Sequence, residues 1–293
     1  MRKRRNCKIS SLILALAMGV LGGTCIAGAQ GAEPARALTS FTDPSGGNVI
    51  IIGFVGGFVS PDDAKHPEVQ FAAYLRDRYP FVHAEVFGNH HGQKALHWLA
   101  HLLDSEHNDS MPSAKREPAT IILYGHSWGA FEIVSFAQQL RKMNIPVALT
   151  IQVDTINKPG RKISAIPDNV ASAINFYQTR GPLHGVPKIV AANPAKTRII
   201  GNIPMTYEDR PINCSNYSWY SRLFNKPHHE IENDLRVWDE AGSLIDSSLS
   251  KKTLIVETAS PSNSRFFKYL RRGVQADIAA TAPLEIASAP ETK

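Results

Sequence analysis

The sequence predicts an α/β fold in which a mostly parallel central sheet carries helices on both faces. Apolar, β-branched runs typical of strands buried on both faces recur along the chain, as in Asn48–Phe54. Segments with helical spacing of apolar residues alternate with these runs, which favours parallel strands joined by helices. The chain has 293 residues, 43% of them hydrophobic and 20% charged, so it is long enough to bury one large core.

The predicted elements form one domain over residues 48–275. In chain order they are a strand over Asn48–Phe54, a helix over Pro67–Arg78, a strand over Phe81–Phe87, a helix marked by Ala95 to Leu103, a strand over Thr120–Tyr124, a helix marked by Ala130 to Leu140, strands over Val147–Val153, Ala171–Tyr177 and Arg198–Ile203, and a helix over Ile231–Leu244. Residues 105–118 are polar and contain proline, which predicts a loop. No long helical insertion lies between Asp154 and Arg198, so we expect little or no cap over the sheet.

The first 29 residues have the three parts of a secretory signal peptide. Five positive residues precede an apolar run from Ile9 to Ala29, which ends in Ala-Gly-Ala. We expect Sec-type export with cleavage after Ala29, which leaves a periplasmic or secreted protein. One alternative is an uncleaved anchor helix. A lipoprotein attached through Cys25 is disfavoured because Thr24, rather than Gly or Ala, precedes that cysteine.

Removal of residues 1–29 changes the charge of the chain. The full sequence has a net charge of +6, but the remainder carries 27 Lys and Arg against 26 Asp and Glu. The basic character therefore belongs to the export signal, and we expect neither a nucleic-acid partner nor stable membrane insertion after cleavage. Cys214 is then the single cysteine, so no intramolecular disulfide can form. Residues 30–47 are expected to be a flexible leader and residues 276–293 a disordered tail.

The segment Gly125–Gly129 reads Gly-x-Ser-x-Gly at the junction of a strand and a helix. Small residues two positions before and after the serine allow a tight turn that raises its hydroxyl above the sheet. The start of the helix also directs free backbone N–H groups toward a developing oxyanion. Ser127 is therefore the predicted nucleophile. The alternative is a glycine-rich turn with an incidental serine, which the agreement of strand, pentapeptide and helix disfavours.

A serine hydroxyl needs a general base, which a carboxylate must orient. The chain order nucleophile, acid, histidine leaves His184, His228 and His229 as candidates. His184 precedes the Arg198–Ile203 strand, whereas the histidine pair follows it, as the base should. We select His228, in a loop before the predicted last helix, and keep His229 as the alternate. The pair could also be two solvent-facing loop histidines without a catalytic role.

The predicted acid is Asp154, which ends the strand Val147–Val153. Carboxylates at the carboxyl ends of parallel strands face the crevice where α/β proteins place their sites. Asp168, in an Ile-Pro-Asp-Asn segment, is the reserve choice, although it could simply cap the next element.

An oxyanion hole needs two N–H donors. The first is predicted to be Trp128, directly after the nucleophile. The second should come from the glycine-rich loop after the first strand, where we select Phe54 and keep Val55 as the alternate. This loop matches neither phosphate-binding glycine pattern.

Four features together resemble the lipase and esterase branch of the α/β-hydrolase superfamily, over roughly Asn48 to Leu244: the glycine loop Gly53–Gly57, the elbow Gly125–Gly129, the strand-terminal Asp154 and the late His228. The resemblance implies an α/β-hydrolase fold with a Ser-His-Asp triad. The sequence departs from the commonest lipase pattern because no histidine opens the glycine loop. Trp128 also stands where a small residue or leucine is usual.

These features predict an exported serine hydrolase that cleaves carboxylic esters through an acyl-enzyme, without a cofactor. An apolar mouth formed by Phe54, Phe58, Val59 and Trp128 would suit a small-molecule or lipid ester. Two alternatives remain: a thioesterase or other acyl hydrolase with the same triad, and a non-catalytic binding protein of the same fold. The sequence does not indicate an oligomeric state.

A metal site is the competing interpretation of four other histidines. His97 and His101 lie four residues apart on a predicted helix, with His90 and His91 before them. The glutamate of a zinc-protease motif is missing, because position 98 is Trp. We therefore expect solvated histidines and no metal.

Overall fold

The computed structural model describes residues 48–105 and 119–250. The predicted export signal (1–29), leader (30–47) and tail (276–293) lie outside these residues, as does most of the predicted loop 105–118. Among the helices of the two described ranges, none is long and apolar enough to cross a membrane.

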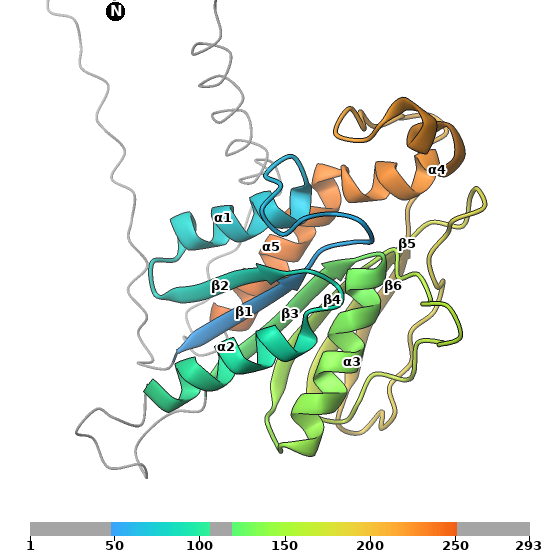
Figure 1. Ribbon diagram of the computed structural model, residues 1–293. Coiled ribbons are helices and arrows are strands. Elements are labelled where there is room, and N and C mark those ends of the chain that lie inside the picture. The colour runs from blue at the N-terminus through green and yellow to red at the C-terminus, as the bar shows by residue number, and fades with distance from the viewer. Residues whose placement is uncertain (1–47, 106–118, 251–293) are drawn as a thin grey trace, which may run out of the picture. The chain divides into compact units, whose positions relative to one another are not determined.

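The core of the fold is a six-stranded, entirely parallel sheet (Figure 1). In chain order the elements are β1 (Val49–Phe54), α1 (Pro67–Arg78), β2 (Val82–Phe87), α2 (Gly92–Ser105), β3 (Thr120–His126), α3 (Trp128–Lys142), β4 (Val147–Val153), β5 (Val170–Tyr177), β6 (Arg198–Pro204), α4 (Trp219–Glu232) and α5 (Leu235–Ser250). The strand order is β2-β1-β3-β4-β5-β6. The predicted α/β-hydrolase type of architecture is confirmed.

Helices cover both faces of the sheet because alternate residues of the strands bury on opposite sides. On one face, Ile51 and Ile122 pack with side chains of α1 and α5, such as Phe71 and Trp238. On the other face, strand residues that include Ile50 pack with side chains of α2 and α3. All six residues of β1 are buried, as the continuous apolar run predicts.

The predicted elements up to β6 are confirmed within one or two residues at most boundaries, but the C-terminal prediction is wrong. The expected helix over Ile231–Leu244 does not exist as one unit. The chain leaves α4 after Glu232 and begins α5 at Leu235, where the Asp234 carboxylate accepts the N–H of Arg236 as a helix cap. His228 consequently lies inside α4 rather than in a loop.

Helix α4 itself is bent. Asn225 has non-helical backbone angles (φ −124°, ψ 24°), two residues before Pro227. Proline removes a backbone donor and crowds the preceding turn, which explains the break. The short segment after the break carries both histidines of the predicted pair.

Candidate active site

The two central strands of the sheet, β3 and β4, bring the predicted nucleophile and acid together. Ser127 follows β3 and Asp154 follows β4, and these strands pair in parallel with His126 opposite Val153. Both side chains therefore start from the same carboxyl edge of the sheet, where sites of open α/β folds lie. A backbone hydrogen bond from Ser127 N to Val153 O (2.9 Å) joins the two strand ends.

Helix α4 supplies the third group. His228 Nε2 lies 3.0 Å from Ser127 Oγ, and His228 Nδ1 lies 2.7 Å from Asp154 Oδ2. With the proton on Nδ1, the imidazole donates a hydrogen bond to the Asp154 carboxylate, and Nε2 accepts a hydrogen bond from the Ser127 hydroxyl. All three side chains are buried. This is the arrangement in which a histidine can take the serine proton while the carboxylate orients the ring.

The turn that presents Ser127 is strained in the way a nucleophile elbow requires. Ser127 has φ 57° and ψ −121°, a conformation that non-glycine residues rarely adopt. A Cβ on Gly125 would lie 2.6 Å from the carbonyl carbon of Gly129, and a Cβ on Gly129 would lie 2.0 Å from the Phe54 carbonyl oxygen. The two glycines are thus required by close backbone approach.

Hydrogen bonds fix the Asp154 carboxylate beside the His228 ring. Its Oδ1 accepts the backbone N–H of Gln178 (3.0 Å), and its Oδ2 accepts the side-chain amide of the same residue (2.8 Å). The fit is tight, because a Cβ on Gly185 would lie 2.2 Å from Oδ1. Three hydrogen bonds, counting the one from His228, therefore stabilise a fully buried carboxylate.

The surroundings of His228 favour the neutral form that a general base needs. Burial lowers the pKa of His228 and outweighs the hydrogen bond to Asp154, which raises it. Repulsion from His126, whose ring centroid lies 4.6 Å away, lowers the pKa further.

The alternate bases lie elsewhere. His229 turns away from the nucleophile: its Nε2 lies 2.8 Å from Ser221 Oγ, and its ring stacks on Tyr217 at 3.6 Å. Burial and the neighbouring histidines lower the pKa of His229 to about 3. His184 is exposed and its Nδ1 lies 3.1 Å from the Gly181 carbonyl oxygen.

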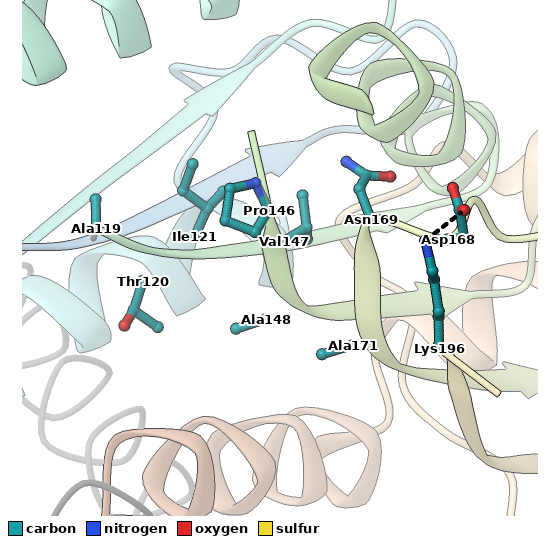
Figure 2. A pocket seen from close by; sticks show the side chains of 10 residues that line it. All are labelled: Ala119, Thr120, Ile121, Pro146, Val147, Ala148, Asp168, Asn169, Ala171 and Lys196. Carbon is teal, nitrogen blue, oxygen red and sulfur yellow. Dashed lines mark hydrogen bonds and ion pairs between the residues drawn. The ribbon is translucent and has the colours of Figure 1, made fainter. Parts of the chain in front are cut away.

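The reserve acid Asp168 lies at the opposite edge of the sheet. It lines a hollow beside the first residues of β3, β4 and β5 (Figure 2). Its carboxylate pairs with Arg141 and with Lys196 (3.3 Å), and the hydrogen bond from Arg141 lowers the pKa of Asp168. Asp168 and Ser127 thus lie at opposite ends of the strands, too far apart for Asp168 to orient the base. Asp168 instead forms ion pairs with Arg141 and Lys196.

The predicted second oxyanion donors, Phe54 and Val55, are engaged in the sheet. Phe54 is the last residue of β1, paired with Phe87 on one side and Gly125 on the other. The N–H of Val55 donates to the Phe87 carbonyl (3.0 Å). The prediction is therefore not supported, because it assumed that the loop begins one or two residues earlier. Trp128, at the start of α3, keeps the predicted position next to the nucleophile.

The next three residues of the glycine loop pass directly over the elbow. A Cβ on Gly56 would lie 3.5 Å from Ser127 Cβ, and a Cβ on Gly57 would lie 2.9 Å from the Trp128 ring. Phe58 has φ 63° and a fully exposed side chain near the Trp128 ring. A left-handed phenylalanine is strained, and such strain often marks a functional loop.

The mouth of the site is less uniformly apolar than predicted. The Phe54 side chain points into the core against Phe87 and Phe136, so it does not line the mouth of the site. A hollow of about 380 Å³ beside Trp128 also contains charged groups. Its lining residues are His90, Trp128, Glu132, Lys158, Pro159 and Arg161. Exposed apolar side chains lie instead on α4, before His228 in the chain: Trp219, Tyr220, Leu223 and Phe224.

A second histidine–carboxylate group, which the sequence analysis did not predict, lies next to the first. His66, Glu68, His126 and Glu232 are buried together. Burial alone would lower the pKa of His126, but Glu232 and Glu68 raise it to about 9. Burial and repulsion from Glu68 raise the pKa of Glu232. The sequence contains only a weak indication of this group, because His66 and Glu68 are also ordinary residues for the start of a helix.

The four histidines weighed as a metal site are all exposed. Among the residues that the structure describes, the group with metal-ligand geometry is His66, Glu68 and Glu232 instead. The expectation that His90, His91, His97 and His101 are solvated is consistent with their exposure.

Comparisons with known proteins add little to this geometry. No protein-family model and no curated protein matches the chain. Among solved structures, the chain is similar to a protein from Pectobacterium atrosepticum SCRI1043 described as a YdeN-like hydrolase. The identity is 14% and the TM-score 0.25, over 54% of this chain and 77% of the other. At that level the similarity carries no functional inference, and the sheet itself establishes the fold.

Proposed function

We propose that the protein is a serine hydrolase that cleaves carboxylic esters. One observation supports this most directly: Ser127 Oγ lies 3.0 Å from His228 Nε2, while His228 Nδ1 lies 2.7 Å from Asp154. Three residues from distant parts of the chain meet with the separations that proton transfer needs. The strained backbone of Ser127 is a second, independent sign that this turn serves chemistry.

In the proposed reaction, His228 removes the hydroxyl proton as Ser127 Oγ attacks the ester carbonyl. The Trp128 N–H stabilises the developing oxyanion, together with an N–H from Gly57 or Phe58, which pass over the elbow. His228 then returns the proton to the leaving alcohol. Water, activated by the same imidazole, hydrolyses the acyl-enzyme and frees Ser127.

The substrate class proposed is an ester with an apolar acyl group, from a small molecule or a lipid. The apolar side chains exposed on α4 lie just before His228 and offer the acyl chain a surface. The charged hollow beside Trp128 can receive a polar alcohol portion.

The test is covalent labelling with a fluorophosphonate, followed by turnover of p-nitrophenyl esters of increasing acyl length. Wild-type protein should label on Ser127 and hydrolyse at least one ester of the panel. Ser127→Ala should do neither, and His229→Ala should do both, since His229 lies off the reaction path. A folded wild-type protein that neither labels nor turns over any acyl substrate would indicate a binding protein. Turnover of acyl thioesters alone would indicate a thioesterase.

We also propose export, on the basis of the first 29 residues. Expression of the full chain in a bacterial host, followed by fractionation and N-terminal sequencing, tests it. A periplasmic or secreted product beginning at Gln30 is expected. A full-length product retained in the membrane fraction would favour the anchor instead.

A further inference from the structure

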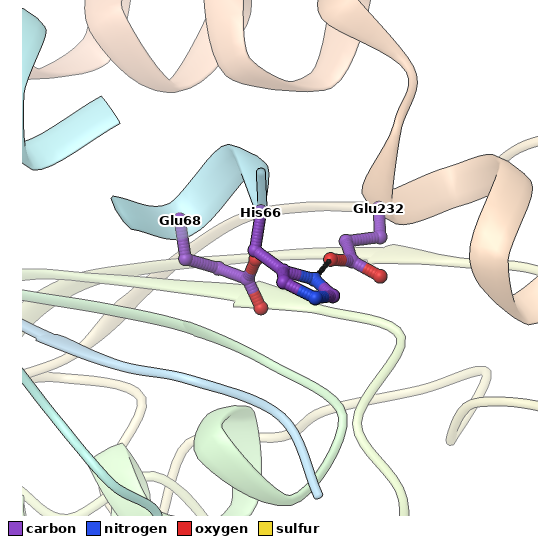
Figure 3. A group of neighbouring side chains, drawn as sticks. All are labelled: His66, Glu68 and Glu232. Atoms are coloured by element: carbon purple, nitrogen blue, oxygen red, sulfur yellow. Dashed lines mark hydrogen bonds and ion pairs between the residues drawn. The ribbon is translucent and has the colours of Figure 1, made fainter. Parts of the chain in front are cut away.

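The buried group beside the triad joins two elements that are far apart in the chain. His66 and Glu68 flank the first residue of α1, and Glu232 is the last residue of α4 (Figure 3). One potential ligand atom from each lies within 4.8 Å of the other two. The closest pair is His66 Nδ1 and Glu232 Oε1, 2.7 Å apart. The Glu68 carboxylate points toward the same imidazole (Figure 3).

Within the described residues, the Glu68 carboxylate has no hydrogen-bond partner that accounts for its burial. Its side chain is 0% exposed, and neither carboxylate oxygen accepts a hydrogen bond of regular geometry within the described residues. The nearest cationic group is His126 Nδ1, 3.3 Å from Oε1. A buried carboxylate without hydrogen bonds is costly, and such orphaned groups often mark a position where a ligand binds.

The two buried carboxylates of the group need balancing positive charge. Glu68 and Glu232 are both fully buried, and their ion pairs in the described chain are with histidines, not with Lys or Arg. Two carboxylates are balanced either by two imidazolium groups or by one divalent cation with neutral imidazoles. The second solution also gives one free oxygen of Glu68 a partner.

The inward-facing atoms of His66 and Glu232 share one hydrogen bond, whose proton a cation would replace. Tyr217 donates its hydroxyl to Glu232 Oε2, so that Oε1 faces His66. Asp63 Oδ2 lies 3.8 Å from His66 Nε2, on the far side of the ring from Nδ1. Metal-binding histidines commonly turn their second ring nitrogen toward a carboxylate, and ligating carboxylates are themselves hydrogen-bonded.

We propose that His66, Glu68 and Glu232 bind one divalent cation of the zinc class through His66 Nδ1 and one oxygen of each carboxylate. Mixed imidazole and carboxylate ligands favour Zn²⁺ over Mg²⁺ or Ca²⁺, which prefer oxygen ligands alone. A tetrahedral Zn²⁺ with ligand distances of roughly 2.0–2.2 Å holds its ligand atoms about 3.4 Å apart. Small side-chain rotations that widen the 2.7 Å pair and bring Glu68 closer would reach this geometry. The bound cation fastens the end of α4 to the start of α1.

This site would serve the proposed hydrolase by holding α4, which carries His228 four residues before Glu232. The inference about the cation does not depend on the activity. It is tested with readouts that involve no substrate.

The first measurement uses the wild type alone. The purified chain is stripped with a chelator, loaded with one equivalent of Zn²⁺ or Co²⁺, and passed through a desalting column. One retained equivalent by elemental analysis, a Co²⁺ visible spectrum typical of low coordination number, and a rise in Tm of about 5 °C are expected. No retained metal and no change in Tm would overturn the proposal.

The second measurement locates the ion. The exposed pair His97 and His101, four residues apart on α2, is the obvious competing surface site. His97→Ala/His101→Ala should therefore retain the metal as the wild type does. Glu68→Gln, which is isosteric, and His66→Gln should each lose at least tenfold in metal retention. Circular dichroism checks that both variants are folded.

If the His97→Ala/His101→Ala variant loses the metal instead, the ion binds at the surface and the proposal is wrong. Should Glu68→Gln not fold, the wild-type Co²⁺ spectrum and His66→Gln still decide. A fluorophosphonate-negative protein that retains zinc would refute the proposed hydrolase and keep the cation site. A labelled protein without zinc affinity would do the reverse.

Discussion

Two buried histidine–carboxylate groups lie side by side at the carboxyl edge of the sheet, and they differ in how fully their polar atoms are paired. In the first, Asp154 accepts three hydrogen bonds and both nitrogens of His228 have partners. In the second, Glu68 and His126 meet at 3.3 Å without a regular hydrogen bond. The two groups meet where the rings of His126 and His228 lie 4.6 Å apart between centroids, tilted by 30°.

The difference teaches that burial and proximity alone do not define a role. A fully paired carboxylate fixes the orientation of its histidine, which suits proton transfer. An incompletely paired carboxylate remains available for a ligand, which suits binding. Each prediction below tests one side of this comparison, beginning with the largest expected effect.

The largest effect is expected from His228→Ala. Loss of the base should lower kcat by about 10⁴-fold or more, because an unactivated hydroxyl attacks esters poorly. Steady-state ester hydrolysis measures it. The matched control is His229→Ala, one residue further on and bonded to Ser221 instead of the nucleophile. A loss of less than tenfold is expected there, and equal losses in the two variants would erase the distinction between the neighbouring histidines.

Gly185→Ala should break the orientation of the acid without removing any triad member. The added methyl group would lie 2.2 Å from Asp154 Oδ1 and must displace the carboxylate. A misplacement on the order of 1 Å is expected to lower kcat by about 10²-fold, with KM little changed. The control is Gly160→Ala, where a Cβ would meet nothing within 4 Å and where a positive φ of 70° adds a backbone strain that Gly185 does not share. Full activity in Gly185→Ala would mean that Asp154 does not need its present position.

His126→Gln should affect stability more than turnover. The substitution removes the imidazole nearest to the buried Glu68 carboxylate, so we expect the free energy of unfolding to fall by about 3 kcal/mol. Urea unfolding measures the change, and Glu68→Gln/His126→Gln should recover part of it because no charge is then left unpaired. If His126→Gln is as stable as the wild type, the Glu68–His126 pair does not contribute to the free energy of unfolding.

The smallest expected effect is a displacement of the pH profile. Only neutral His228 can accept the serine proton, and burial lowers the pKa of that imidazole from its ordinary 6.5. The sign follows directly: the active form persists to more acidic pH. The acidic limb of kcat/KM should therefore lie below pH 6.5. An apparent pKa above 7 on that limb would contradict the burial of the base.

The sequence was sufficient to predict the sheet, the tight turn at Ser127 and the position of Asp154 directly after β4. Each rests on a local pattern: a β-branched run, small residues around a serine, or a carboxylate directly after a strand. Parallel pairing then brings strand ends together without further information.

The remaining features depend on contacts between distant segments. The choice between His228 and His229 depends on the direction in which α4 emerges from its break at Asn225, which no local pattern encodes. The glycines suggested that the loop begins at Phe54 or Val55. In the structure the hydrogen bonds between β1 and β2 continue to Val55, one residue beyond the end of β1. His66, Glu68 and Glu232 come from two elements and share no motif, so their meeting is visible only in three dimensions.

Ser127 and His228 are separated by 101 positions along the chain. All six strands precede α4, so the sheet and the strained elbow can form while the base has yet to dock. The protein should therefore acquire reactivity late in folding, when its C-terminal helices settle against a finished scaffold. Partly synthesised chains that end before α4 would carry Ser127 without His228.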